Sequence, residues 1–223
     1  MSRQRIYNLI SLIVCGFIFI STVIVVAMGV ATGPEAAQPG VEDMTGLGYF
    51  KAFTVDSNVL MGITSLIVAV FNIKNIVQNR DEMPKWVILI QFVSAVAVSV
   101  TMMTTILFLG PKTVIEGHNY FWLFSGTLFF LHFLNPLLTI LVVMFLLRKI
   151  RINWKYCLFG IIPVFVYSLF YVPFVLTGIW LDFYGFTFGG YIWAAPLSLL
   201  VMYGVSYLFS FLISLVHNKY VEE

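Results

Sequence analysis

The fold is decided first by residues 6–30, IYNLISLIVCGFIFISTVIVVAMGV, which contain no charged side chain. An α-helix needs about 20 apolar residues to cross roughly 30 Å of hydrocarbon. Arg3 and Arg5 precede this run, which is longer than the apolar core of a signal peptide. We therefore interpret it as a membrane span that the protein retains.

Five further apolar runs follow, and each break between runs holds charge, Pro or Gly. The breaks are marked by Gly33-Pro34 and Pro39-Gly40 with Glu35, Glu42 and Asp43, by residues 78–85, by Gly110-Pro111, which closes the third run, and by residues 148–151. From hydropathy alone we expect spans near 6–30, 52–73, 86–109, 120–147, 155–180 and 192–216.

The composition indicates that lipid is the solvent for most of the chain. Hydrophobic residues make up 61% of the 223 positions, charged residues make up 10%, and the mean hydropathy is +0.98. A soluble domain is nearer half apolar and a quarter charged, so these few charges could not cover a water-facing surface. The sequence predicts a single all-α domain over residues 1–223, a polytopic membrane bundle of six transmembrane helices, with no nucleic-acid partner.

The basic residues fall mainly on one side of such a bundle. With the N-terminus inside, only Lys51 and Lys112 of the 12 Lys and Arg residues lie outside. Short cytoplasmic loops of membrane proteins carry an excess of Lys and Arg. We therefore expect cytoplasmic N- and C-termini and a multi-pass protein of the cell (plasma) membrane. The sequence does not set an oligomeric state.

A histidine lies deep in the fourth run, within Leu131-His132-Phe133-Leu134-Asn135-Pro136. About twelve residues at 1.5 Å each place it near the midplane of the membrane. Pro136 cannot donate to the carbonyl of His132, so a kink is expected there, with Asn135 on nearly the same face. Two interpretations stay open for His132, a functional group or a partner in an interhelical hydrogen bond.

A second polar cluster, FTVDSN at residues 53–58, stands at the outer start of the second run. On a helix, Thr54 and Asn58 share a face, Ser57 lies beside them, and Asp56 points roughly the opposite way. The same residue types satisfy free amides at the start of a helix. Periodicity alone therefore favours helix capping as their role.

The third run carries a polar stripe on one helical face, at spacings of three and four. Its members are Gln91, Ser94, Thr101 and Thr105. Small hydroxyl residues commonly mediate close helix packing in membranes, so packing is favoured, and lining a cavity is the alternative. The outer groups Glu116, His118 and Asp182 are expected to be solvated loop residues.

Several kinds of site are missing from the sequence. It contains no Gly-x-Ser-x-Gly elbow, no His-Glu-x-x-His zinc helix and no phosphate-binding glycine loop. Cys15 and Cys157 lie in or beside apolar runs without a metal or redox spacing. A pair of haems would need histidines paired on two helices, and only His132 is deep. We therefore expect no metal and no cofactor.

Residues 50–58, FKAFTVDSN, resemble a signature of one membrane family, a phenylalanine-threonine followed two residues on by serine-asparagine. That family includes the androgen-induced and androgen-dependent transmembrane proteins and their bacterial relatives. His132, with Pro136 four residues later, resembles its second hallmark. The animal members cleave fatty acid esters of hydroxy fatty acids with a threonine nucleophile and a histidine. The resemblance places these roles on Thr54 and His132.

The resemblance thus implies a carboxylic ester hydrolase of membrane lipids or other long-chain esters. A neutral imidazole on His132 would take the proton of the Thr54 hydroxyl during its attack on the ester carbonyl. The supporting groups would be Asn58 or Ser57 as oxyanion donors, Asn135 as the group that orients His132, and Thr101, Thr105 and Pro136 as pocket residues. The alternatives are a non-enzymatic lipid-binding protein or small-molecule transporter that uses the same cavity, and a structural membrane subunit.

The proposed pair also constrains one boundary. A span that starts at Thr54 leaves its hydroxyl near the outer interface, whereas His132 lies near the midplane. Either the second span starts earlier, near Leu47, or the fourth starts later than residue 120. We therefore extend the expected second span to 47–73, and we expect residues 46–51 to be helical or buried.

Overall fold

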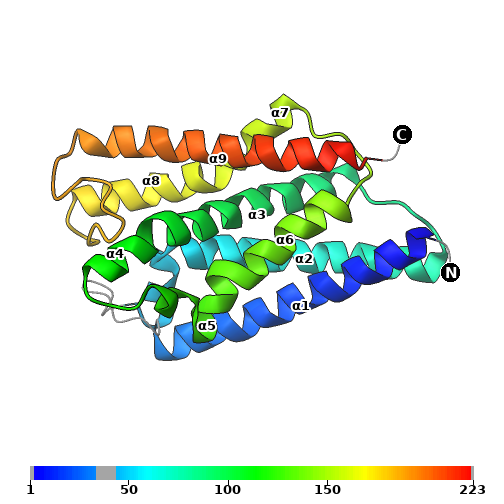
Figure 1. Cartoon of the computed structure of the whole chain (residues 1–223), viewed down its shortest axis with the longest axis horizontal. Helices are drawn as coiled ribbons and strands as arrows, with labels where there is room; N and C mark the ends of the chain where they lie inside the picture. The colour runs from blue at the N-terminus through cyan, green and yellow to red at the C-terminus, as the bar shows by residue number, and fades with distance from the viewer. Residues whose placement is uncertain (1–2, 34–43, 222–223) are drawn as a thin grey trace.

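The computed structural model describes residues 3–33 and 44–221, and its regular structure within these residues is entirely helical. Six helices of this described part are long and apolar enough to cross a membrane. Figure 1 shows them side by side along the long axis of one bundle. The six-span, all-α fold is therefore confirmed, and the chain is a multi-pass integral membrane protein. The Pro, Gly and acidic residues predicted in the first loop at positions 34–43 lie outside the described residues.

Each span is built from one to three consecutive helical segments. The first three spans are α1 (Arg3–Thr32), α2 (Phe53–Gln78), and α3 (Lys85–Thr104) continued by η2 (Thr105–Leu109) and α4 (Gly110–Ile115). The fourth joins α5 (Gly126–Phe129), η4 (Phe130–Leu134) and α6 (Asn135–Phe145). The fifth joins α7 (Trp154–Cys157), η5 (Leu158–Ile161) and α8 (Ile162–Leu176), and the sixth is α9 (Ala194–Lys219). Two further 3₁₀ segments, η1 (Gly46–Lys51) and η3 (Tyr120–Phe124), precede the second and fourth spans.

The third span is the centre of the bundle, because α3 packs against α2, α6, α8 and α9. Its predicted polar stripe faces α2. Thr64 donates to Ser94 over 2.9 Å, and the Gln91 amide donates to the Ser65 hydroxyl over 3.2 Å. Interhelical bonds of this kind stabilise membrane bundles, so the packing role is confirmed for this part of the stripe.

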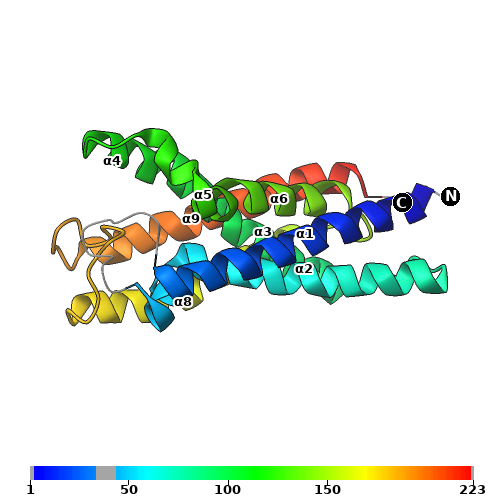
Figure 2. The ribbon, with the colours of Figure 1, turned by 90° about the horizontal axis from the view of Figure 1, so that it is seen from below.

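Two spans pass through a π-helical turn just before a proline. The segment η2 ends two residues before Pro111, and η4 ends two residues before Pro136. Proline lacks an N–H group, and a π turn is one way for a helix to continue past the missing bond. The prediction that Gly110-Pro111 closes the third span is therefore wrong. The helix runs on to Ile115, and Figure 2 shows α4 leaning away from α8 and α9.

The start of the second span differs from the expected residue 47. Residues 46–51 are helical, as the proposed chemistry requires, but they form a separate 3₁₀ segment with Tyr49 buried. Ala52 has an extended backbone (φ −92°, ψ 126°), so α2 begins at Phe53. The fourth span begins later than expected, at Gly126. His132 therefore lies six residues, roughly 9 Å, below the start of that span.

The start of α1 and the end of α9 lie at one end of the bundle, here called the terminal end (Figure 1). Lys149 pairs with Asp81 at this end, and Gln4 donates to the same carboxylate over 2.7 Å. The opposite end holds η1, η3 and the connection at residues 177–193, and is called the Thr54 end. The assignment of the terminal end to the cytoplasm stays a prediction from the basic residues.

Candidate active site

A cavity of about 340 Å³ opens at the Thr54 end, between the start of α2, the end of α3 and the connection that precedes α9. Four threonines, Thr54, Thr101, Thr104 and Thr105, line it together with Ser198. The remaining wall is mainly apolar and aromatic, and includes Phe53, Phe108, Tyr184, Leu197 and Val201. A mostly apolar cavity of this size with a few convergent polar groups is typical of a small-molecule or lipid site.

Thr54 is the second residue of α2 and is half-buried at the cavity wall. The carbonyl of Ala52 accepts the first helical bonds, from Val55 and Asp56. The amides of Phe53 and Thr54 precede those bonds and lie at the positive end of the helix dipole. The N-cap residue is Ala52, which makes no side-chain capping bond, and Ser57 and Asn58 bond to the Thr54 carbonyl instead of to these amides. The capping role that periodicity favoured for the FTVDSN cluster is therefore wrong.

The phenol of Tyr184, which lies in the connection between α8 and α9, bonds to the backbone at the start of α2. Burial raises the pKa of Tyr184 to about 12, while hydrogen bonding with the Thr54 side chain and with the backbone of Thr54 and Phe53 acts in the opposite direction. The phenol therefore keeps its proton at neutral pH. Tyr184 gives the cavity a hydrogen-bond donor next to the Thr54 hydroxyl, and the sequence alone did not identify it.

Asp182 holds the segment that carries Tyr184. One carboxylate oxygen accepts from the Tyr171 hydroxyl (3.0 Å) and the Phe186 amide (2.9 Å). The other accepts from the Thr187 amide (2.7 Å) and hydroxyl (2.6 Å). Partial burial raises the pKa of Asp182, but these hydrogen bonds outweigh it and hold the pKa below its usual range. The prediction that Asp182 is merely a solvated loop residue is wrong, because its carboxylate orders the loop.

The two residues predicted as oxyanion donors are already engaged. The Asn58 amide nitrogen donates to the carbonyl of Thr54 (2.7 Å) and to that of Leu131 (3.0 Å), which uses both of its hydrogens. Its own oxygen is buried without a partner among the described residues. Ser57 is paired with Thr101 over 2.9 Å. The oxyanion role expected for Asn58 or Ser57 stays a prediction, and it would require one of these hydrogen bonds to be given up.

His132 lies in the π turn η4 and is 6% exposed. Its Nδ1 atom is 2.8 Å from the carbonyl oxygen of Leu123. Because a carbonyl only accepts, Nδ1 carries the proton of this bond, and the neutral ring then has Nε2 free to act as a base. This is the tautomer that a general-base histidine needs.

Asn135 was expected to orient the ring of His132, and this expectation is wrong. The carbonyl of Leu123 orients the ring instead. The Asn135 amide instead bonds to α1, where its oxygen accepts from Ser21 (3.0 Å) and its nitrogen donates to Thr22 (3.4 Å). Pro136 is buried next to it and does not line the cavity around Thr54.

Thr54 and His132 are on neighbouring segments and are joined through Asn58. The same Asn58 nitrogen bonds the carbonyl of Thr54 and the carbonyl of Leu131, the residue before His132. The structure thus brings the start of α2 next to the histidine turn. Within the described residues, no hydrogen bond joins the Thr54 hydroxyl to the His132 ring, and His132 does not line the cavity.

The remaining polar residues of interest lie away from this site. Glu116 pairs with Lys112 one turn earlier, and the His118 ring packs on Trp122. His217, which the sequence did not single out, is buried at the terminal end with its ring nitrogens 2.7 Å and 2.8 Å from the carbonyls of Val143 and Ile150. It ties α9 to the end of α6 and has a structural role.

The candidate site therefore consists of Thr54, Tyr184 and the hydroxyl pair Thr101 and Thr105 around the cavity, with His132 behind the start of α2. Comparison with protein-family models, with curated proteins and with solved structures finds no match for this chain.

Proposed function

We propose that the protein is an intramembrane hydrolase of long-chain lipid esters, with Thr54 as the nucleophile and His132 as the general base. The observation that carries this proposal is the position of the Thr54 hydroxyl. It lies at a largely apolar cavity, beside the phenol of Tyr184, which also bonds to the amides that begin α2. An acyl chain fits such a wall, and the phenol is placed where a carbonyl oxygen would become negative.

The proposed reaction has two halves. The Thr54 hydroxyl attacks the ester carbonyl while its proton passes to Nε2 of His132, through a water molecule that bridges the gap between the two side chains. The resulting oxyanion accepts a hydrogen bond from the Tyr184 hydroxyl, whose oxygen in turn accepts from the amides that begin α2. The carbon–oxygen bond to the alcohol then breaks, and His132 returns the proton to the leaving alkoxide.

In the second half, water hydrolyses the acyl-threonine. His132 takes one proton from the water as the oxygen attacks the acyl carbonyl, and the bond to Thr54 breaks as its oxygen is reprotonated. The products are a fatty acid and the regenerated hydroxyl. The chain needs no metal or redox partner for either half. With the terminal end in the cytoplasm, the reaction takes place in the outer half of the cell membrane.

Labelling with a long-chain fluorophosphonate tests the nucleophile. We expect wild-type protein to be labelled at Thr54, Thr54→Ser to retain labelling, and Thr54→Val, which keeps the shape without the hydroxyl, to lose it. Thr104→Val is the matched control, because Thr104 lines the same cavity and is expected to be dispensable. Label found on Thr104 or equally on Thr54→Val would contradict the assignment.

A non-enzymatic lipid-binding protein or a transporter is the second candidate. One observation supports it: among the described residues, no hydrogen bond joins the Thr54 hydroxyl to the His132 ring. Such a protein would bind long-chain esters in the same cavity, fail to react with the fluorophosphonate and release no fatty acid. His132→Ala distinguishes the two. In an enzyme this variant would lose the labelling that wild type shows, and in a binding protein neither form would be labelled; ester binding would be nearly unchanged in both cases.

A further inference from the structure

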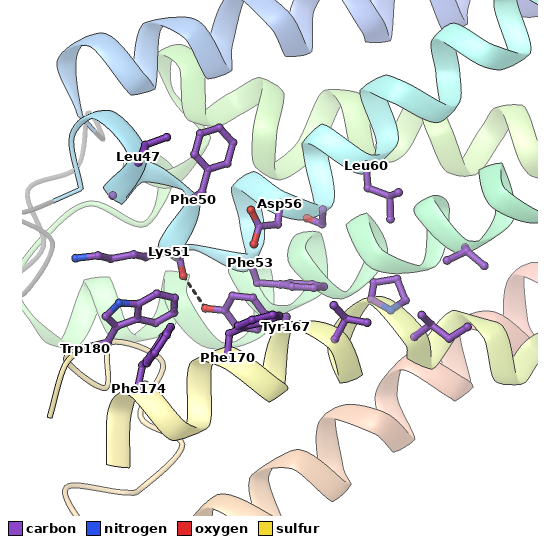
Figure 3. A pocket seen from close by; sticks show the side chains of 16 residues that line it. Leu47, Phe50, Lys51, Phe53, Asp56, Leu60, Tyr167, Phe170, Phe174 and Trp180 are labelled. Atoms are coloured by element: carbon purple, nitrogen blue, oxygen red, sulfur yellow. Dashed lines mark hydrogen bonds between the residues drawn. The ribbon is translucent and has the colours of Figure 1, made fainter. Parts of the chain in front are cut away.

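A second and larger cavity, of about 810 Å³, lies between α2 and α8 on the other side of Phe53 and Tyr167, which form a wall common to both cavities. The Phe53 and Tyr167 rings meet edge to face at 5.3 Å, and the Tyr167 hydroxyl donates to the carbonyl of Lys51 over 2.7 Å. Figure 3 shows this wall with α2 above it and α8 below. The second cavity is therefore a separate compartment from the one that Thr54 faces.

One carboxylate stands inside this larger cavity. Asp56 lines it, and the described residues provide its side chain with no hydrogen bond and no ion pair. Figure 3 shows Lys51, the cation at the same cavity, extending away from Asp56. A partly buried carboxylate without a counter-ion is energetically costly, so the cavity favours a ligand that carries a positive charge.

The surroundings of Asp56 also fit a cation attached to a hydrocarbon chain. The cavity that Asp56 lines is rich in aromatic rings, which attract an ammonium group through their faces. These rings are Phe50, Phe53, Tyr167, Phe170, Phe174 and Trp180. One helical turn deeper, the lining becomes aliphatic, with Leu60, Val93 and Ile162. Ile162, Val166 and Phe170 are each about half exposed, so the cavity opens sideways toward lipid.

We propose that this compartment binds a long-chain amine, with the ammonium group on Asp56 and the alkyl chain along Leu60, Val93 and Ile162. The order of charged, aromatic and aliphatic groups along the cavity indicates the chemical class of the ligand. An aliphatic stretch follows the carboxylate toward the bilayer centre, which matches an amphiphile with a cationic head and one apolar tail. A fatty acid with its tail along the same aliphatic stretch would place its carboxylate next to Asp56, where like charges repel.

Equilibrium binding of radiolabelled hexadecylamine to the purified full-length protein in non-ionic detergent tests the proposal. We expect saturable binding to the wild type and weaker binding of hexadecanol and hexadecanoate, which have the same chain and different heads. Asp56→Asn is expected to weaken amine binding about tenfold or more, since it removes a charged hydrogen-bond partner. Glu116→Gln is the matched control, because it removes an exposed carboxylate at the same end of the bundle.

Leu60→Trp fills the aliphatic part of the cavity without changing charge, and it is also expected to abolish saturable binding. It keeps the proposal testable if Asp56→Asn does not fold. Equal binding of hexadecylamine and hexadecanol, preference for hexadecanoate, or unchanged amine binding by a folded Asp56 or Leu60 variant would each overturn the proposal. Ester hydrolysis by Thr54 is not needed for any of these readouts, so the two proposals can fail separately.

Discussion

The amide nitrogen of Asn58 donates to the carbonyl oxygen of Leu131 over 3.0 Å, and this bond joins the start of the second span to the turn that holds His132. The same nitrogen also bonds the carbonyl of Thr54. A single buried side chain therefore fixes the relative position of the two proposed catalytic residues. We therefore propose a positioning role for Asn58 in the candidate site.

We expect Asn58→Leu to lower the stability of the bundle by about 1–2 kcal/mol, the range measured for interhelical hydrogen bonds in membranes. Thermal unfolding in detergent measures this loss. Ester hydrolysis should fall further than stability does, because Thr54 and His132 lose their common tie. Asn153→Ala, which removes an exposed capping amide from the start of α7, is the control and should leave hydrolysis intact. An Asn58→Leu protein of wild-type stability and activity would contradict the positioning role.

Tyr184→Phe is expected to lower the rate of ester hydrolysis by about tenfold to a thousandfold, the effect of removing one oxyanion donor. The substitution keeps the ring and its packing, so the melting temperature should change little. Because burial raises the pKa of Tyr184 to about 12, the phenol is a proton donor across the neutral range, and its contribution should not vary between pH 6 and pH 9. Unchanged turnover by Tyr184→Phe would remove this residue from the site.

Asp182 predicts how the loop responds to acid. The hydrogen bonds hold its folded pKa below the unfolded value, so its stabilisation of the loop is complete above the unfolded pKa and is lost as the pH falls through the folded pKa. Limited proteolysis within residues 177–193 should therefore increase in that acidic window. Asp182→Asn should show the same increase at neutral pH. Equal protease resistance of Asp182→Asn and wild type at neutral pH would contradict this account.

Gly29 tests the packing of the segment before Thr54. A Cβ atom on Gly29 would overlap the ring of Tyr49, which is buried in η1. Gly29→Ala should therefore displace η1 and destabilise the protein by about 1–3 kcal/mol, the usual effect of overpacking. Gly16→Ala on the same helix is the matched control, since its Cβ would meet nothing within 4 Å. Thermal unfolding of both variants should show a loss for Gly29→Ala alone.

The six spans could be predicted because lipid imposes a simple requirement, about 20 apolar residues for each crossing. The boundaries could not be predicted as well. The 3₁₀ segment η3 (YFWLF) is as aromatic and apolar as the span that follows it, so hydropathy merges the two. For the second span, hydropathy placed the start at residue 52, close to Phe53, and the extension to residue 47 came from the proposed chemistry. Gly110-Pro111 suggested a helix end, but the π turn before it lets the helix continue.

The site was predicted only as far as local pattern allows. The helical spacing of Thr54 and Asn58 indicated a common face. The Asn58 amide indeed bonds both to the Thr54 carbonyl and to the carbonyl of Leu131, next to His132. The partners of Asn135 and Asp182 depend on contacts between distant segments, with Ser21 on α1 and with the loop around Thr187. Tyr184 also reaches Thr54 from a loop without periodicity, so no sequence pattern identified it.

The most direct test of the central claim is the release of free fatty acid from a fatty acid ester of a hydroxy fatty acid, measured with purified protein. Wild type is compared with Thr54→Val and His132→Ala, and Thr104→Val is the control. We predict steady release by wild type and Thr104→Val, and rates lower by about a thousandfold or more for the other two variants. Release by Thr54→Val at the wild-type rate, or no release by folded wild type from any long-chain ester, would contradict the account.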